Sequence, residues 1–187
     1  MALTESTSIS LGSLIKKFLL PCIDGQTYTH DSWPDAKALV IIFMCNHCPY
    51  VQALWPRLVK FQAKYGPKGA QLVGINSNDD ANYPEDNFEN MKKYASERGQ
   101  NFPYLRDETQ ETAKAFGAVC TPDIFVYDSQ RMLVYHGRFD DNWKDENAVK
   151  SRDLQNAVDA VLAGSKPAEG QFPSMGCSIK WRESFGQ

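Results

Sequence analysis

The sequence predicts an α/β fold with a central mixed β-sheet and helices on both of its faces. Two runs of apolar residues, 38–44 and 70–76, are typical of strands that are buried on both sides of a sheet. Strands that alternate with amphipathic segments, as these do, favour a sheet covered by helices on both faces. Two further strand-like segments flank the polar turn 128–130 and are expected to pair antiparallel, which makes the sheet mixed.

The first elements in the chain are a hairpin, a strand and a helix. The hairpin is expected over residues 14–30, because Asp24 and Gly25 form a typical tight turn between two short strand-like segments. Strand 38–44 leads into a helix over 48–65, whose apolar residues recur at helical spacing and which ends before Gly66. Pro56 is expected to kink this helix.

The second half of the chain alternates in the same way. A helix with an acidic first turn is expected over 84–98, followed by a short strand at 104–105. Asp107 and Gln110 resemble a capping box, which predicts a helix that ends at Phe116. Strands 124–127 and 132–136 then form the antiparallel pair. A clear apolar stripe predicts a final helix over 154–162.

The length of 187 residues fits a single domain. We expect a core over residues 14–164, with the hairpin as an N-terminal extension. The tail 165–187 has two prolines and no periodic pattern, which predicts an irregular segment. The stretch 76–82, which is rich in Asn and Asp, and the pair Asp140-Asp141 are expected to be solvated loops.

The charge pattern argues against two classes of partner. The net charge is −3, and no cluster of Lys and Arg is visible, so we expect neither a nucleic-acid partner nor a membrane partner. No apolar run is long enough for a membrane helix. The N-terminal segment lacks the order of a secretory signal, since Lys16 and Lys17 interrupt its apolar patch. A cytoplasmic location is therefore expected.

Five cysteines carry the candidate chemistry: Cys22, Cys45, Cys48, Cys120 and Cys177. An odd number without an export signal argues against a framework of structural disulfides. Cys45 and Cys48 enclose Asn46 and His47 where a buried strand ends and a helix begins. Free N–H groups and the helix dipole stabilise a thiolate there, and a protonated His47 would lower the thiol pKa further. We therefore expect a solvent-accessible redox pair.

A metal site is the alternative for the same residues. Two cysteines separated by two residues also occur in zinc sites, but a structural site needs a second pair of ligands. The distant candidates Cys120, Cys177, His30 and His136 have no paired spacing. A copper or zinc site would have to use Cys45, Cys48 and a histidine. The redox interpretation requires no cofactor.

Two segments resemble the thioredoxin-like superfamily, in the redoxin branch that includes AhpC/TSA-type peroxiredoxins and thiol reductases. They are the strand–CxxC–helix segment VIIFMCNHCPYVQALWPRL, at 40–58, and Cys120-Thr121-Pro122-Asp123 before a strand. The resemblance covers about 14–164 and implies a thioredoxin-like fold. It also implies a cis Pro122 after Thr121, in a loop that faces the active cysteines and pairs with the substrate chain.

The sequence also departs from this superfamily. Thioredoxins bury an aspartate in the strand before the active cysteines, but 39–42 contains no carboxylate. A proton acceptor must come from elsewhere. The thioredoxin helix has a proline eight residues after the nucleophile, and Pro56 lies eight residues after Cys48. Cys45 then takes the position at which peroxiredoxins have Thr or Ser. Which of the two cysteines attacks is left open.

Together these residues predict thiol–disulfide exchange by Cys45 and Cys48. His47 would tune the thiol pKa, and Thr121 and Pro122 would dock the substrate. A thiol peroxidase with Cys48 as the attacking residue is the alternative enzyme. Cys120 and Cys177 are candidate auxiliary thiols. Expected partners are a disulfide-bearing protein, a small-molecule disulfide or a peroxide, and an external reductant such as the thioredoxin or glutathione system.

Overall fold

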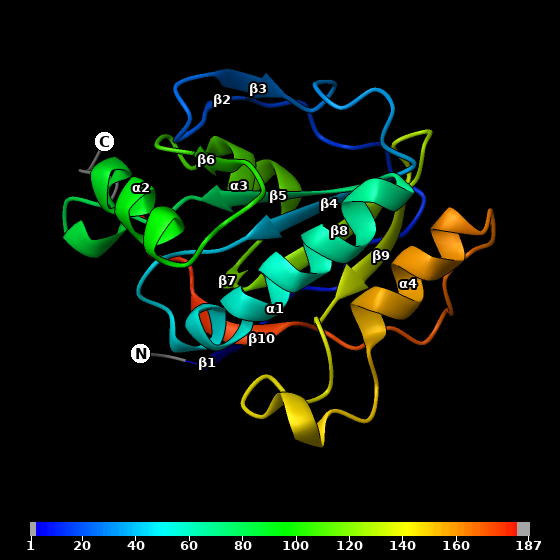
Figure 1. Cartoon of the computed structure of the whole chain (residues 1–187). Coiled ribbons are helices and arrows are strands. Elements are labelled where there is room, and N and C mark those ends of the chain that lie inside the picture. Colours follow the sequence, from blue (N-terminus) through cyan, green and yellow to red (C-terminus); the bar gives the residue numbers. More distant parts are fainter. Residues whose placement is uncertain (1–2, 183–187) are drawn as a thin grey trace.

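The computed structural model describes residues 3–182 and contains a five-stranded central sheet (Figure 1). The strand order is β6-β5-β4-β8-β9. The bounds are β4 Ala38–Phe43, β5 Ala70–Asn76, β6 Tyr104–Arg106, β8 Asp123–Tyr127 and β9 Leu133–Gly137. Strands β4, β5 and β6 are parallel, whereas β8 and β9 are antiparallel to their neighbours. The predicted mixed sheet is confirmed.

Between residues 3 and 182, four α-helices and three short 3₁₀ helices connect the strands. The α-helices are α1 Pro49–Tyr65, α2 Phe88–Glu97, α3 Glu111–Phe116 and α4 Asp153–Leu162; the 3₁₀ helices are η1 Gly66–Lys68, η2 Pro84–Asp86 and η3 Glu146–Ala148. Helix α1 runs without interruption through Pro56. Among the helices of residues 3–182, none combines the length and the apolar character needed to cross a bilayer.

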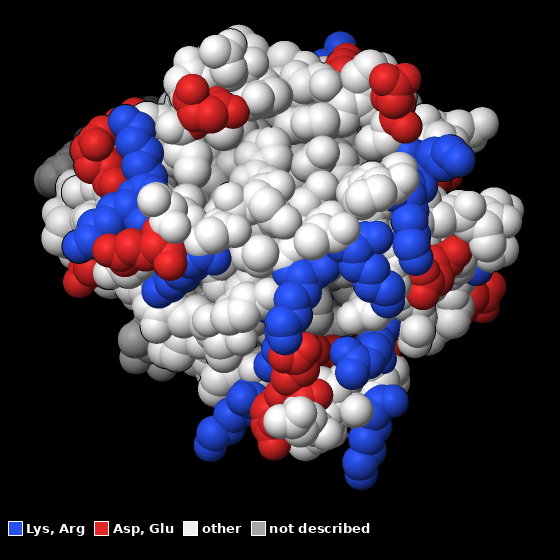
Figure 2. All heavy atoms as spheres, in the orientation of Figure 1, with Lys and Arg blue, Asp and Glu red and all other residues white. Residues whose placement is uncertain are grey.

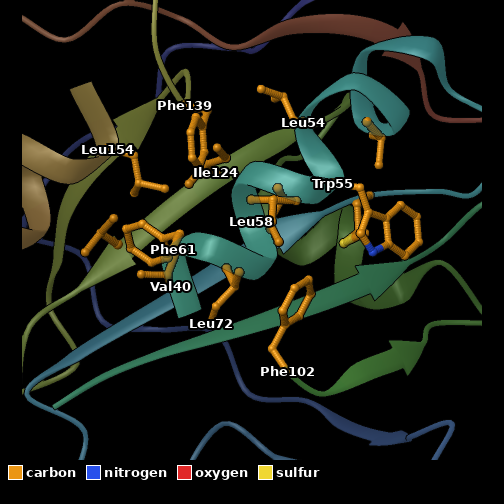
Figure 3. Close-up of a cluster of buried hydrophobic side chains, with 14 of the residues drawn as sticks. Val40, Leu54, Trp55, Leu58, Phe61, Leu72, Phe102, Ile124, Phe139 and Leu154 are labelled. Carbon is orange, nitrogen blue, oxygen red and sulfur yellow. The ribbon is translucent and has the colours of Figure 1, made fainter. Parts of the chain in front are cut away.

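Alternate side chains of β4 form the centre of two hydrophobic clusters, one on each face of the sheet. Val40 and Ile42 pack in the first cluster with residues of α1 and α4, including Leu58 and Leu154 (Figure 3). Leu39, Ile41 and Phe43 pack in the second cluster, which includes residues of α3. Because both faces of β4 are covered, its apolar run has no polar alternation. The strand that leads to the cysteines is thus packed on both faces.

Two smaller sheets lie outside the central one. Strands β2 Leu19–Pro21 and β3 Thr27–Thr29 form the predicted hairpin. The other sheet has the order β1-β10-β7, with β1 Leu3–Glu5, β10 Met175–Ser178 and β7 Cys120–Thr121. The expected irregular tail 165–187 therefore contains a strand, which forms because the edge of β7 is available for pairing. Residues 183–187 lie outside the described part of the chain.

Two helix boundaries differ from the prediction. Helix α2 begins at Phe88 rather than at Pro84, because the Asn87 side chain accepts a hydrogen bond from the Asn90 amide and caps the helix there. Helix α3 has no capping box. The Asp107 carboxylate accepts hydrogen bonds from the amides of Thr112 and Ala113 in the first turn of this helix. The Gln110 side chain does not reach back to Asp107 but donates to the Ser77 carbonyl.

The two loops that were expected to be solvated are each partly buried, whereas Ala81, Asn82 and Asp141 are exposed as expected. In 76–82, Asn76 and Asp79 are buried and their polar atoms have partners within the loop and in the C-terminal segment. Asp140 is also buried and accepts a hydrogen bond of 2.6 Å from Arg57 of α1. Asn and Asp side chains can be buried at such positions because neighbouring groups satisfy them. On the face of the molecule shown in Figure 2, positive and negative side chains interleave.

Candidate active site

The two cysteines of the CxxC segment lie between the end of β4 and the start of α1. Cys48 is the residue immediately before the helix and has an extended backbone. Its sulfur lies 3.1 Å from the Thr121 carbonyl oxygen, and the Cys45 sulfur lies 3.3 Å from the Thr121 hydroxyl. The Thr121–Pro122 peptide bond is cis, as the resemblance implied. The CxxC segment and the cis-proline segment therefore meet at Thr121.

The surroundings of Cys48 favour its thiolate. The Cys45 thiol, as a hydrogen-bond donor, is the largest influence on this group, and burial acts in the opposite direction. The amide of Val51 in the first turn of α1, and the thiol and amide of Cys177, also lower the pKa of Cys48, to about 5. When the Cys48 sulfur is protonated, it donates to the Thr121 carbonyl.

Cys45 has the opposite character. Burial is the main reason that its pKa is raised well above the usual value, and the hydrogen bond with Cys48 and the charge of Asp86 act in the same direction. The proton shared by the two thiols therefore resides on Cys45, while Cys48 carries the charge. This asymmetry supports Cys48 as the attacking residue, an assignment that the sequence left open.

Asp86 is the site residue that the sequence did not reveal. Its carboxylate is fully buried and accepts hydrogen bonds of 2.6 Å from the Asn46 amide, 2.6 Å from His47 Nδ1 and 2.7 Å from the Asn78 side chain. Burial opposes its ionisation, but the hydrogen bonds from His47 and Asn78 outweigh it, so the pKa of Asp86 is lowered. The same contact raises the pKa of His47. A carboxylate thus reaches the cysteines from η2 rather than from β4.

The redox pair is covered, which contradicts the expectation of a solvent-accessible sulfur. Cys48 is 0% exposed and Cys45 is 1% exposed. Strand β10 lies against β7, with Cys177 opposite Thr121. Gly176 allows this close approach, since a Cβ atom there would lie 2.0 Å from the Thr121 carbonyl oxygen. The C-terminal segment therefore closes over the cis-proline segment.

The two candidate auxiliary thiols have different surroundings. Cys177 is buried and interacts with Cys48, and burial followed by this hydrogen bond raises the pKa of Cys177 to about 12. Cys120 is also buried, and its sulfur donates to the Pro122 carbonyl at 3.7 Å. Burial is the main cause of its raised pKa. Both lie near the CxxC segment, but Cys177 is the one with a hydrogen bond to Cys48.

The metal interpretation needs a different set of ligands from the one expected. In the described part of the chain, one group of three candidate ligands has its atoms within 4.8 Å of one another, and it contains Cys45, His47 and Asp86 rather than Cys48. The hydrogen bonds between His47 and Asp86, and between Cys45 and Thr121, already account for this arrangement. His136 is paired with Asp123, at 2.8 Å, and is not part of the group.

A cleft of about 290 Å³ opens beside the cis-proline segment. Its apolar lining comes from Leu54, Pro122, Phe139, Trp143, Phe172 and Met175. Arg138, Asp140 and Asp141 add charged groups at the same place. A mixed apolar and charged cleft of this kind, next to Pro122, can hold a peptide segment or a small molecule.

The central sheet, the CxxC segment before α1 and the cis-proline segment beside it define a thioredoxin-like fold. The thioredoxin domain of a thiol-disulfide oxidoreductase from Bacteroides vulgatus shares this fold, with 17% identity, a TM-score of 0.59, and coverage of 69% of this chain and 89% of that chain. Within this class, residues 11–136 match the AhpC/TSA family. The chain belongs to the AhpC/TSA family.

Two relatives extend this comparison. An uncharacterized conserved protein from Geobacillus kaustophilus has 44% identity, a TM-score of 0.93, and coverage of 98% of both chains. The thiol-disulfide oxidoreductase ResA of Geobacillus thermodenitrificans is 23% identical over 125 residues, which is 67% of each protein. The relatives of this chain thus include thiol-disulfide oxidoreductases.

Proposed function

We propose that the protein is a thiol–disulfide oxidoreductase in which Cys48 attacks the substrate and Cys45 completes the exchange. The observation that carries the proposal is geometric: Cys48 lies at the start of α1, and both sulfurs contact Thr121 of the cis-proline segment, at 3.1 and 3.3 Å. The lowered pKa of Cys48 and the raised pKa of Cys45 agree with this arrangement. Only the thiolate attacks a disulfide, so a site that holds the charge on one sulfur and the proton on its neighbour suits this reaction.

The exchange has two steps. The Cys48 thiolate attacks one sulfur of the substrate disulfide, so that a mixed disulfide forms and the other substrate sulfur leaves as a thiolate. Cys45 then loses its proton and attacks the Cys48 sulfur, which releases the second substrate thiol and leaves a Cys45–Cys48 disulfide. The substrate thiolate released in the first step accepts that proton, since it is a stronger base than Asp86, whose pKa is lowered. An external thiol reductant restores both thiols.

The cleft beside Pro122 is the proposed docking site. Its apolar lining suits the side chains that flank a cystine, and the backbone of Thr121 lies at the sulfurs. The proposed substrates are therefore a disulfide-bearing protein or a small-molecule disulfide. In a reducing compartment such as the cytoplasm, the resting form is the dithiol.

Reduction of insulin, or of a small disulfide, tests the proposal, with dithiothreitol or a thioredoxin system as the electron donor. Cys48→Ser should abolish the activity, and Cys45→Ser should reduce it. Cys22→Ser serves as a control and should leave the activity unchanged. Cys22 is buried in another region, where its backbone forms an isolated β-bridge with Leu105 of β6. Full activity in Cys48→Ser protein would refute the proposal.

Asp86 is proposed as a positioning residue for His47, which it contacts at 2.6 Å. Asp86→Asn should lower the His47 pKa, which an NMR titration of the imidazole protons measures, because the charge beside the ring is lost. An unchanged His47 titration in folded Asp86→Asn protein would show that the carboxylate does not control this ring.

A further inference from the structure

Strand β10 occupies the edge of β7 that directly precedes the cis proline. The two strands are antiparallel, with Cys177 opposite Thr121 and Ser178 opposite Cys120. On its other side β10 pairs with β1, where Cys177 lies opposite Leu3. The edge at which an incoming chain would add to β7 is therefore filled by the protein's own C-terminal segment.

This strand is fastened on both sides of Cys177. Before it, the Ser174 hydroxyl donates to the Gly137 carbonyl at 2.6 Å. After it, the Ile179 amide donates to the Val119 carbonyl at 2.9 Å, and the Lys180 amide donates to the Asn78 side chain at 2.9 Å. These contacts, together with the absence of a side chain at Gly176, hold Cys177 in register with Thr121.

Cys48 consequently has two thiols as neighbours, and they come from different parts of the chain. Cys45 approaches from the loop before α1, and Cys177 approaches from β10. Both are hydrogen-bonded to the Cys48 sulfur. Cys120, although it lies next to Thr121, directs its thiol to the Pro122 carbonyl instead.

We propose that Cys177 is a third redox thiol, which β10 presents to Cys48 as a tethered substrate strand, and that the two residues form an intramolecular disulfide. The inference rests on the proposed function, because it takes Cys48 as the nucleophile. In the mixed disulfide, Cys177 loses its proton and its sulfur attacks the Cys48 sulfur. The bond between Cys48 and the substrate breaks, and the substrate leaves as a thiol with that proton.

Two electrons then pass from Cys48 and Cys177 to the substrate disulfide, and an external dithiol reductant returns them by opening the Cys48–Cys177 bond. Cys45 and Cys177 are thus alternative thiols that attack the Cys48 sulfur of the mixed disulfide and release the substrate. The Cys48–Cys177 bond would also join β10 covalently to the start of α1 and keep the substrate edge of β7 closed until the reductant acts.

Disulfide mapping tests this inference in Cys45→Ser protein, in which Cys48 cannot bond to Cys45. The folded protein is oxidised with diamide, blocked with an alkylating agent and digested with trypsin. Cys48 lies in peptide 38–57 and Cys177 in peptide 153–180. We expect these two peptides to be the main cross-linked pair. The pair should disappear in Cys45→Ser/Cys177→Ser protein and persist in Cys45→Ser/Cys22→Ser protein.

Trapping of the substrate provides a second readout. With a disulfide substrate, Cys45→Ser should still release its product, whereas Cys45→Ser/Cys177→Ser should accumulate the mixed disulfide at Cys48. The inference is overturned if oxidised Cys45→Ser protein contains no link between 38–57 and 153–180, or links 38–57 to peptide 115–131, which carries Cys120. Either result leaves the proposed function intact. The proposed function fails instead if Cys48→Ser retains full disulfide reductase activity.

Discussion

Alkylation of Cys48 by iodoacetamide should depend on pH in a way that distinguishes it from an ordinary thiol. The pKa of Cys48 is lowered to about 5, whereas an unperturbed cysteine titrates near ~8.5. Since the thiolate is the reacting species, the rate for Cys48 should reach half of its plateau near pH ~5. The rate for an ordinary thiol would continue to rise up to pH ~9.

The shape of this profile is more informative than the rate at neutral pH. At pH ~7 the thiolate fraction of Cys48 exceeds that of an ordinary thiol by about 30-fold, but thiolate nucleophilicity falls with pKa by a similar factor, with a Brønsted slope of about 0.4–0.5. The two effects nearly cancel. At pH ~5.5 the ratio of thiolate fractions is several hundred, so Cys48 should react roughly 20-fold faster than an equally accessible ordinary thiol.

Cys45→Ala provides the perturbation, because it removes the thiol that contributes most to the low pKa of Cys48. A hydrogen bond to a charged group contributes about 1.5–3 kcal/mol, which corresponds to a rise of about one to two pH units in the midpoint. Mass spectrometry of peptide 38–57 reports the alkylated fraction over time. Cys22→Ala is the matched control. A wild-type midpoint near pH ~8.5, or identical midpoints in wild-type and Cys45→Ala protein, would refute the reasoning.

Three further predictions concern strand β10 over Cys48, the buried ion pair of Arg57 and Asp140, and metals. Gly176→Ala should displace β10, because the added Cβ would lie 2.0 Å from the Thr121 carbonyl oxygen, and it should therefore speed alkylation of Cys48. Gly170→Ala is the control and should leave the alkylation rate unchanged, because its added Cβ would have no neighbouring atom within 4 Å. Arg57→Ala should lower the free energy of unfolding by about 3–5 kcal/mol in urea titrations, because it leaves buried Asp140 without its cation. Protein purified with a chelator should retain full disulfide reductase activity, and a need for added zinc or copper would contradict the redox interpretation.

The sequence predicted the parts of the site that depend on local pattern. The apolar run of β4 identified a strand covered on both faces, and the CxxC segment after it marked the start of a helix. The element order then placed Thr121 and Pro122 opposite the cysteines, and the cis bond is present. Each of these features follows from residues that are neighbours in the chain or from the order of the elements.

The features that were missed depend on contacts between distant residues. Asp86 resembled an acid in the first turn of a helix. Its carboxylate instead accepts hydrogen bonds from Asn46 and His47 of the CxxC segment, about 40 residues away in sequence. Gln110 resembled half of a capping box, but its amide bonds to the carbonyls of Ser77 and Lys180. Strand β10 is too short to show alternation and forms because β7 offers an unpaired edge. No local pattern distinguishes these residues from ordinary surface positions.

The late position of β10 in the sequence has a consequence for biosynthesis. The central sheet and α1 are complete once residue 137 has been made, whereas the strand that covers Cys48 ends at residue 178. At typical elongation rates the ribosome needs about 2–8 s for the intervening segment. A nascent chain that folds as it emerges would carry an uncovered Cys48 thiol during that interval, so small disulfides present at the ribosome would meet the protein in its most accessible form.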